Sequence, residues 1–377
     1  MVLAQILCAG VLLLWASSIP AEQKAAERAQ QAGGNYTPTG GSQSQDSGQA
    51  SATAAAESLR QGTKLTMQGQ FAAAIPLLHA AQTGGASGYA AGFNLALCYV
   101  GTGRYVDAIT QLQALQGMGR NTAAVNNLMA QAYLGKGDLQ QAWASIQEAA
   151  RLAPTDEKMY ALLLNACTDH YAYALGLQVA DLGLTALLDS ARLHYERAMF
   201  LARLDRFDEA KPEFAKAAQL DPGGDVGYLA LVQERLYQDR LPEALDLARR
   251  AVNAGHRDYQ MLSLLGTVLM FSGAAPASPE FAEARSALEA SVSERGDYST
   301  SQIALGKLYL MEGRAAEAIP HLEAGRRLEP QNPAVYTSLA SAYRRIGDKQ
   351  ASEASLSTLA ALLREKAATA AREQVQP

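Results

Sequence analysis

Hydrophobic and small residues recur at helical spacing in two runs within the stretch Val125–Pro154. Between the runs, Gly137 can take a positive φ at no steric cost, and Asp138 can cap the helix that follows. Pro154 ends the second run, because proline has no N–H with which to continue a helix. The pattern predicts two helices joined by a tight turn, and such a hairpin cannot bury its apolar stripe alone.

The same pattern recurs every 34 residues along the chain. Residues suited to the turn follow this step, with one shift of six residues after the seventh repeat's turn: Gly69, Gly103, Gly137, Asp205, Asp239, Gly273, Gly313 and Gly347. A small residue in the second helix lets two helices approach closely in seven repeats: Ala74, Ala108, Ala142, Ala210, Ala244, Ala284 and Ala318. Four tyrosines share one place in the first helix: Tyr99, Tyr133, Tyr309 and Tyr343. The period predicts stacked hairpins, each covering its neighbour's apolar stripe.

This 34-residue helix–turn–helix unit resembles the tetratricopeptide repeat. The resemblance implies an all-α fold, a right-handed α-solenoid of about nine repeats over residues 54–366. Two repeats depart from the pattern: the fourth has Tyr171 at its turn, and the seventh carries the insertion Gly273–Glu280. The expected repeats lie near 55–88, 89–122, 123–156, 157–190, 191–224, 225–258, 259–298, 299–332 and 333–366.

The ends of the chain differ from the repeats. Residues 1–21 are almost uncharged with an apolar core, which indicates a signal peptide or, alternatively, an N-terminal membrane anchor. We therefore expect export to the periplasm or the extracellular space, with a membrane tether through residues 1–20 if they are not cleaved. Residues 22–53 are predicted to be a disordered Gly/Ser/Gln-rich linker, and residues 367–377 a polar C-terminal helical extension.

Composition and motifs exclude several classes of function. The net charge of −5 is spread through the repeats, which argues against a nucleic-acid groove. We find no phosphate loop, no nucleophile elbow and no paired metal ligands among the scattered histidines, so we expect no enzyme, no cofactor and no metal. Cys98 and Cys167 are predicted to be buried free thiols rather than a disulfide.

The remaining candidate is one face of the first helices. Positions 2, 5, 9 and 12 of each repeat lie on one side of the helix, and in the resembling family this face lines a concave groove that holds ligands. Amide, aromatic, apolar and basic residues occupy it here: Asn127, Gln131, Asn165, Tyr195, Met199, Gln233 and Lys307. Amides can pair with a peptide backbone of any sequence, and Met adapts to different side chains. We therefore expect a scaffold that binds an extended peptide or partner protein there, although these residues would equally suit a self-filled groove.

Two further features leave alternatives open. The fourth repeat is rich in aromatic residues near His170 and His194, including Tyr160, Tyr173 and Tyr195. Together with the groove, these residues would suit a small-molecule or glycan site; alternatively, they provide packing that replaces the missing turn residue. The insertion in the seventh repeat is compatible with a contact loop or with a neutral surface loop.

Overall fold

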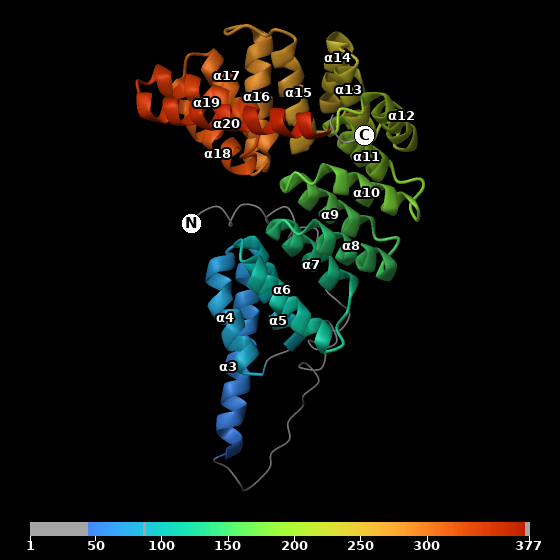
Figure 1. Ribbon diagram of the computed structural model, residues 1–377, viewed down its shortest axis with the longest axis vertical. Coiled ribbons are helices and arrows are strands. Elements are labelled where there is room, and N and C mark those ends of the chain that lie inside the picture. The colour runs from blue at the N-terminus through green and yellow to red at the C-terminus, as the bar shows by residue number, and fades with distance from the viewer. Residues whose placement is uncertain (1–43, 86–87, 374–377) are drawn as a thin grey trace. The chain divides into compact units, whose positions relative to one another are not determined.

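The chain is all-α over the residues that the computed structural model describes, 44–85 and 88–373 (Figure 1). This part of the chain holds helices α3 to α20 and no strand, which confirms the predicted fold class. The chain divides into two compact halves, Met1–Leu188 and Asp189–Pro377. The expected signal peptide or anchor lies outside the described residues.

The predicted linker extends too far toward the first repeat. Helix α3 begins at Ser44, so the last part of the expected 22–53 linker is helical, and the prediction is wrong there. Residues 50–56 read ASATAAA, and alanine has the highest helix propensity of all residues. Their alanine content outweighs the Gly and Ser residues on which the linker prediction was based.

Each half is a series of helix hairpins, with two helices in each of the nine expected repeats. The N-terminal half contains α3 (Ser44–Met67), α4 (Phe71–Thr83), α5 (Gly88–Gly101), α6 (Tyr105–Gly117), α7 (Ala123–Lys136), α8 (Leu139–Leu152), α9 (Glu157–Asp169) and α10 (Tyr173–Leu184). The C-terminal half contains α11 (Ala191–Arg203), α12 (Phe207–Leu220), α13 (Asp225–Tyr237), α14 (Leu241–Asn253), α15 (Tyr259–Phe271), α16 (Pro279–Glu294), α17 (Ser299–Met311), α18 (Ala315–Leu328), α19 (Pro333–Arg345) and α20 (Lys349–Glu373).

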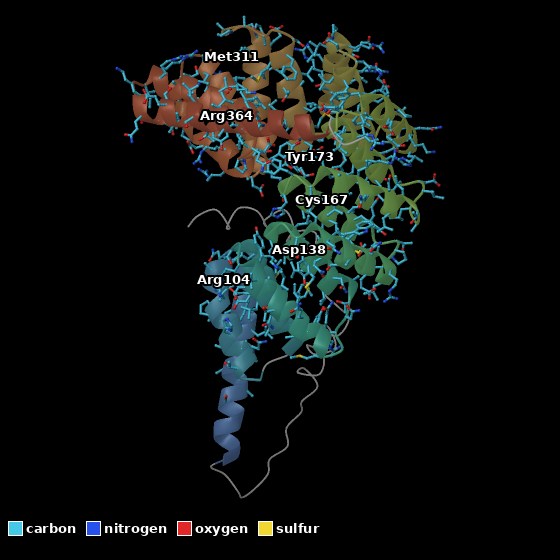
Figure 2. The ribbon with its side chains drawn as sticks, in the orientation of Figure 1. Arg104, Asp138, Cys167, Tyr173, Met311 and Arg364 are labelled. Carbon is cyan, nitrogen blue, oxygen red and sulfur yellow. The ribbon has the colours of Figure 1, made fainter. Side chains whose placement is uncertain are left out.

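The turn between the two helices of a repeat has the same backbone in every repeat. Gly137 has a φ of 81°, and the Asp138 side chain then accepts a hydrogen bond from Gln141 N at 3.2 Å to cap α8 (Figure 2). Tyr171 takes the same left-handed conformation, with a φ of 57°, although its side chain makes this costly. The fourth repeat therefore keeps the turn despite lacking Gly or Asp, and its hairpin α9–α10 is regular.

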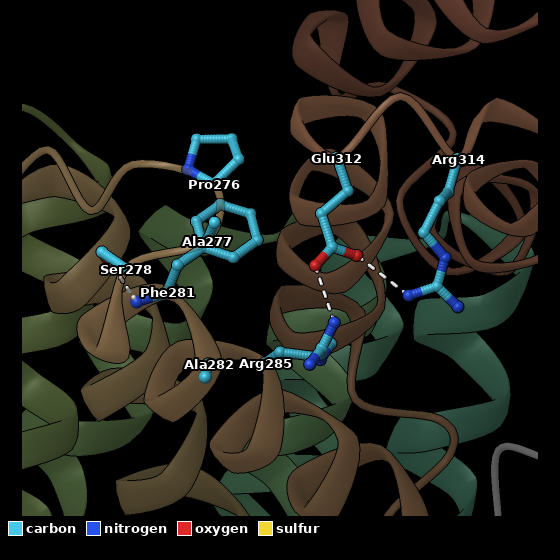
Figure 3. Close-up of a pocket in the computed structure, with 8 residues that line it drawn as sticks. All are labelled: Pro276, Ala277, Ser278, Phe281, Ala282, Arg285, Glu312 and Arg314. Atoms are coloured by element: carbon cyan, nitrogen blue, oxygen red, sulfur yellow. Dashed lines mark hydrogen bonds and ion pairs between the residues drawn. The ribbon is translucent and has the colours of Figure 1, made fainter.

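The insertion of the seventh repeat forms the loop between α15 and α16 (Figure 3). Ala277 has a positive φ of 73°, and the Ser278 hydroxyl then accepts a hydrogen bond from Phe281 N at 3.1 Å. The helix resumes with Pro279 in its first turn, where a missing N–H costs little. The loop is thus closed by a regular helix start.

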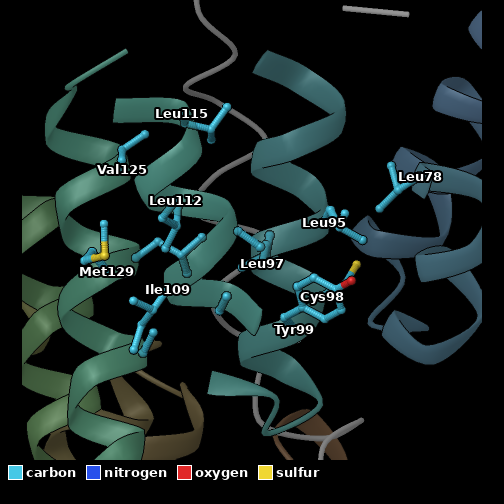
Figure 4. Packing of buried hydrophobic residues seen from close by; sticks show 14 of the residues in the cluster. Leu78, Leu95, Leu97, Cys98, Tyr99, Ile109, Leu112, Leu115, Val125 and Met129 are labelled. Atoms are coloured by element: carbon cyan, nitrogen blue, oxygen red, sulfur yellow. The ribbon is translucent and has the colours of Figure 1, made fainter. Parts of the chain in front are cut away.

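The core consists of the stripes that neighbouring helices bury against one another. In the N-terminal half, Leu78, Leu95 and Leu112 are fully buried in one continuous cluster that extends from α4 to α7 (Figure 4). Cys98 belongs to this cluster and Cys167 is also buried, so both are free thiols as predicted. The stacking of hairpins therefore creates one shared core instead of a separate core in each repeat.

In three repeats, the recurring tyrosine of the first helix forms a hydrogen bond with the second helix of the repeat before it. The Tyr309 hydroxyl donates to Glu289 Oε1 at 3.0 Å, and that of Tyr343 donates to Glu323 Oε1 at 3.0 Å. Tyr99 Oη lies 2.7 Å from His79 Nε2. Each bond connects residues 20 apart in the sequence. The shared place of these tyrosines in the sequence thus reflects a repeated bond between neighbouring hairpins.

Candidate functional site

The candidate surface consists of positions 2, 5, 9 and 12 of the first helices, α3 to α19 in odd numbers; we call it the first-helix face. The structure places the predicted residues of this face in two separate groups. Asn127, Gln131 and Asn165 lie in the N-terminal half, and the others lie in the C-terminal half.

Asn127 is part of the packing between two repeats. Its side chain is only 1% exposed, and its amide donates to Met159 O of α9 at 3.1 Å. Its amide oxygen accepts from Gln131 Nε2 at 2.6 Å. The structure thus brings Asn127 and Gln131 together. However, the amide nitrogen and the amide oxygen of Asn127 already form hydrogen bonds within the protein. Asn127 binds its own neighbouring repeat, and Gln131 covers it.

Asn165 has more freedom to bind a ligand. It lies on α9, is half-buried, and its side-chain amide has no hydrogen-bond partner among the described residues. Because an amide offers both donors and an acceptor, Asn165 can pair with either group of a peptide backbone. In the N-terminal half, it is the predicted amide that best suits this role.

In the C-terminal half, position 5 is part of the core. Tyr195 is 6% exposed and its ring packs edge-on against Phe214, with the ring centroids 6.0 Å apart. Burial raises the pKa of Tyr195 well above its usual value. Leu229, Ser263 and Ile303 occupy the same position in the next repeats and are also buried. Position 5 therefore does not provide an accessible surface in repeats five to eight.

Position 9 forms the accessible row of this half. Its members are half-buried in all five repeats: Met199, Gln233, Thr267, Lys307 and Ser341. The side chains of Gln233 and Lys307 make no hydrogen bond or ion pair with any described residue. The row therefore presents polar groups that are available to a partner, and the flexible Met199 side chain lies at its start. The sequence analysis did not select Thr267 and Ser341, although their spacing in the repeat was sufficient to find them.

Lys307 is a partly desolvated cation. Burial lowers its pKa, and the nearby Glu329 carboxylate opposes that effect. Glu329 itself accepts from the Ser299 hydroxyl at 2.6 Å and from Asn332 Nδ2 at 2.5 Å, so it is held away from direct pairing with Lys307. An anionic ligand group beside Lys307 would supply the charge partner that the lysine lacks.

An ion pair and several tyrosines lie near the start of this row. Arg192 Nη2 is 2.8 Å from Glu196 Oε1, and this carboxylate raises the pKa of Arg192. Tyr259 and Tyr298 pack edge-on with centroids 5.0 Å apart, and Arg295 donates to the Tyr259 hydroxyl at 2.5 Å. The spacing of four between Arg192 and Glu196 could have predicted their pair. The two tyrosines have no such signal, because they lie at opposite ends of the seventh repeat, far apart in the sequence.

The aromatic residues at and beside the fourth repeat make packing contacts within each half. Tyr160 is buried, and the His170 ring packs edge-on against Tyr105 of the second repeat, with centroids 6.1 Å apart. Burial lowers the pKa of His170. His194 pairs with Glu213 Oε2 at 2.6 Å in the C-terminal half. These contacts are typical of packing between helices.

A cavity of about 420 Å³ lies instead at the seventh-repeat insertion (Figure 3). Pro276 and Ala277 of the loop line one side, and Arg285 and Arg314 point at Glu312 on the other. Glu312 accepts from Arg285 Nη1 at 2.7 Å and from Arg314 Nη1 at 2.9 Å. Arg314 also pairs with Glu317, so two carboxylates balance the two guanidinium groups on the charged side of the cavity.

Two further kinds of site are absent from the described part of the chain. No group of three or more His, Cys, Asp or Glu residues there is arranged to hold a metal ion. Among the same residues, every helix is too short or too polar to cross a membrane.

Comparison with known proteins identifies the class. Sequence models of the tetratricopeptide repeat match residues 65–132, 123–156, 191–223, 277–333 and 303–367, together more than half of the chain. The chain therefore belongs to the tetratricopeptide repeat family. Repeats of this family generally mediate protein–protein interaction, and the chain is a protein-interaction scaffold in this general sense. No curated protein matches it.

Solved structures show the same fold. Yeast Tom70 is 15% identical, with a TM-score of 0.52, over 83% of this chain and 67% of that chain. A tetratricopeptide repeat protein from Parabacteroides merdae is also 15% identical, with a TM-score of 0.48, over 67% and 98% of the two chains. A chain of the Cut9–Hcn1 hetero-tetramer of the APC/C is 15% identical, with a TM-score of 0.47. That match covers 71% of the present protein and 52% of the length of the other chain. At these identities the likeness concerns the fold alone.

Proposed function

We propose that the chain is a non-enzymatic scaffold that binds an extended peptide segment of a partner protein along the first-helix face. The observation that carries this proposal is the position-9 row, where five half-buried side chains follow one another at the repeat spacing. An extended chain would cross the row and meet one of these side chains in each repeat.

The chemistry of the row defines the peptide. Lys307 has no ion-pair partner among the described residues, so an acidic side chain of the peptide would be placed beside it. Gln233 can pair with backbone groups, and Met199 can take apolar side chains of different shapes. We therefore expect a peptide with an apolar residue and an acidic residue separated by an extended stretch.

The alternative of a small-molecule or glycan site in the fourth repeat has less support. His170 and Tyr160 are used in packing, and the described cavity lies at the other half's insertion. The charged side chains that line the cavity are already paired with one another, so few polar groups remain to form hydrogen bonds with a glycan.

Selection from a random peptide library tests the proposal. Peptides are selected on the purified chain, and their dissociation constants are measured by fluorescence anisotropy. We expect Gln233→Ala with Lys307→Ala to weaken binding about tenfold or more, which is about 1.4 kcal/mol. Asp208→Ala serves as the control, because that side chain is 98% exposed on a second helix. Selected peptides that bind all three proteins equally would refute the assigned face.

A charge reversal gives a sharper test of the same contact. Lys307→Glu should shift the selected peptides from acidic to basic residues at one position, because the reversed charge repels the original group. Asn127 is not suited to this test, since its loss would remove the hydrogen bond to Met159 O that connects two repeats and so affect the fold.

We also propose that the scaffold acts in the cell envelope. The support is the apolar run in residues 6–15, followed by small residues. Cell fractionation with N-terminal sequencing of the mature chain tests this, and a cytoplasmic chain that begins at Met1 would refute it.

A further inference from the structure

The last repeat exposes a position that every earlier repeat buries. Position 24 of the repeat, on the second helix, is at most 1% exposed in eight repeats: Leu78, Leu112, Ile146, Ala180, Phe214, Ala248, Leu288 and Leu322. The ninth repeat has Leu356 at this position, and Leu356 is 48% exposed.

The difference comes from the missing neighbour. Helix α18, which carries Leu322, packs against both α17 and α19. Helix α20, which carries Leu356, packs extensively only against α19 among the described helices. Among the described helices, Leu356 thus has the partner from its own repeat and no second helix packed on its other side.

The exposed leucine belongs to a longer apolar stripe. Leu356, Ala360, Leu363 and Ala367 follow at spacings of four, three and four, which places them on one side of α20. All four are exposed, and Leu363 is 51% exposed. Three of the four residues precede the expected C-terminal extension at 367–377, which continues α20 to Glu373. A stripe with the spacing of a coiled-coil seam can bury itself against another helix.

The charges beside the stripe indicate which helix that is. Glu353 precedes the stripe and Arg364 lies near its end, both on the same edge and both exposed (Figure 2 labels Arg364). Neither has an ion-pair partner among the described residues. In an antiparallel pair of identical helices, Glu353 of each copy would approach Arg364 of the other. In a parallel pair, like charges would meet.

We propose that two copies of the chain pair through an antiparallel contact between their α20 helices. Leu356 packs against the partner's Leu363, and the two-fold axis passes between Leu359 and Ala360. In this register, Glu353 lies close to the partner's Arg364. The two residues are offset by about two positions, or about 3 Å along the helix axis. The contact is isologous, so each copy contributes the same leucines and the same charges.

The expected dimer is weak. A single pair of helices buries less than the area of about 800 Å² per partner that is typical of stable complexes. We therefore expect a dissociation constant in the micromolar range and a monomer in dilute solution.

Sedimentation velocity of the full chain across about 1 to 200 µM tests the pairing. The unmodified chain should change from monomer to dimer within this range. Leu356→Asp and Leu363→Asp should each weaken the dimer more than tenfold. Val106→Asp is the matched control, because Val106 is 65% exposed on α6 in the other half. A chain that stays monomeric throughout, or aspartate variants that dimerise like the control, would overturn the proposal.

A charge swap tests the antiparallel arrangement. Glu353→Arg and Arg364→Glu should each weaken the dimer, and the double variant should restore it, because both copies then carry the reversed pair. Failure of the double variant to restore the dimer would overturn the antiparallel register.

Cross-linking locates the axis directly. In a Cys8→Ser background, Ala360→Cys should form an intermolecular disulfide under mild oxidation. Ala354→Cys, on the opposite side of α20, should not. Equal cross-linking of both variants would contradict the assigned stripe.

Discussion

Leu322 and Leu356 provide a matched test of how stacking stabilises this chain. Both occupy position 24 of a repeat, but Leu322 is fully buried and Leu356 is 48% exposed. Leu322→Ala should destabilise the contact between the eighth and ninth repeats by about 3 to 5 kcal/mol, because it leaves a closed cavity in addition to the lost burial. Leu356→Ala should cost only about 1 kcal/mol, since half of the side chain is already in water and the space opens to solvent.

Hydrogen exchange followed by mass spectrometry measures both effects locally. Unfolding of a repeat array need not be two-state, so protection in individual helices is more informative than one global midpoint. Leu322→Ala should reduce the protection of α19 and α20 by about 100-fold or more, given about 1.4 kcal/mol per tenfold change. Protection in α5 and α6 should not change, because those helices lie several repeats away. The measurement should be made in dilute solution, where the chain is monomeric.

Equal effects of the two substitutions would refute this reasoning. They would mean that position 24 is stabilised by its own hairpin alone, with no contribution from the following repeat. The Gly306 Cα hydrogens face Leu322, where an added Cβ would come within 2.6 Å of Leu322 Cγ. Because this contact inside the hairpin is tight, equal effects of the two substitutions are physically possible.

Three further predictions concern single groups. Asp239 has a φ of 57°, so Asp239→Val should lower the free energy of unfolding by about 1 to 2 kcal/mol in urea titrations, while Asp239→Gly should not lower it. Burial lowers the pKa of His170, so unfolding takes up a proton at low pH and stability should fall as the pH drops below about 6.5; His170→Phe should reduce this slope in urea midpoints measured from pH 7.5 to 5. Burial raises the pKa of Cys98 to about 11 and of Cys167 to about 12, so a thiol reagent at pH 8 should label both rapidly only after unfolding. Labelling of either cysteine in the folded chain at the rate of a free thiol would contradict its burial.

The sequence predicted the repeating part of the fold because each repeat carries its own local signals. A turn residue, a small residue in the second helix and a tyrosine in the first helix recur at one step, and each has a local physical reason. Tyr171 shows the limit of such signals. Its φ of 57° is imposed by the packing of the hairpin, although the residue itself disfavours it. The start of α3 at Ser44 shows the opposite case, where alanine content outweighed the flexible residues around it.

The candidate site was harder to predict, because accessibility depends on how neighbouring first helices pack. Positions 5 and 9 lie on the same side of the helix and look equivalent in the sequence. In the structure, Tyr195 at position 5 is buried while Met199 at position 9 is half-buried. Asn127 differs again, because its donor reaches a carbonyl 32 residues away in the next repeat. No property of a single helix predicts that bond.

Leu356 shows both a repeat signal in the sequence and the dependence of burial on a neighbouring helix. By its sequence it is a core residue, since eight equivalent positions are buried and its own hairpin partner is present. It is exposed because, among the described helices, only α19 packs extensively against α20. A repeat pattern therefore predicts which residues can be buried, whereas the packing of a neighbouring helix determines whether they are buried. At the interior positions the neighbour is the same chain. At Leu356 and Leu363 the surface is available to another molecule, and its self-complementary charges favour a second copy.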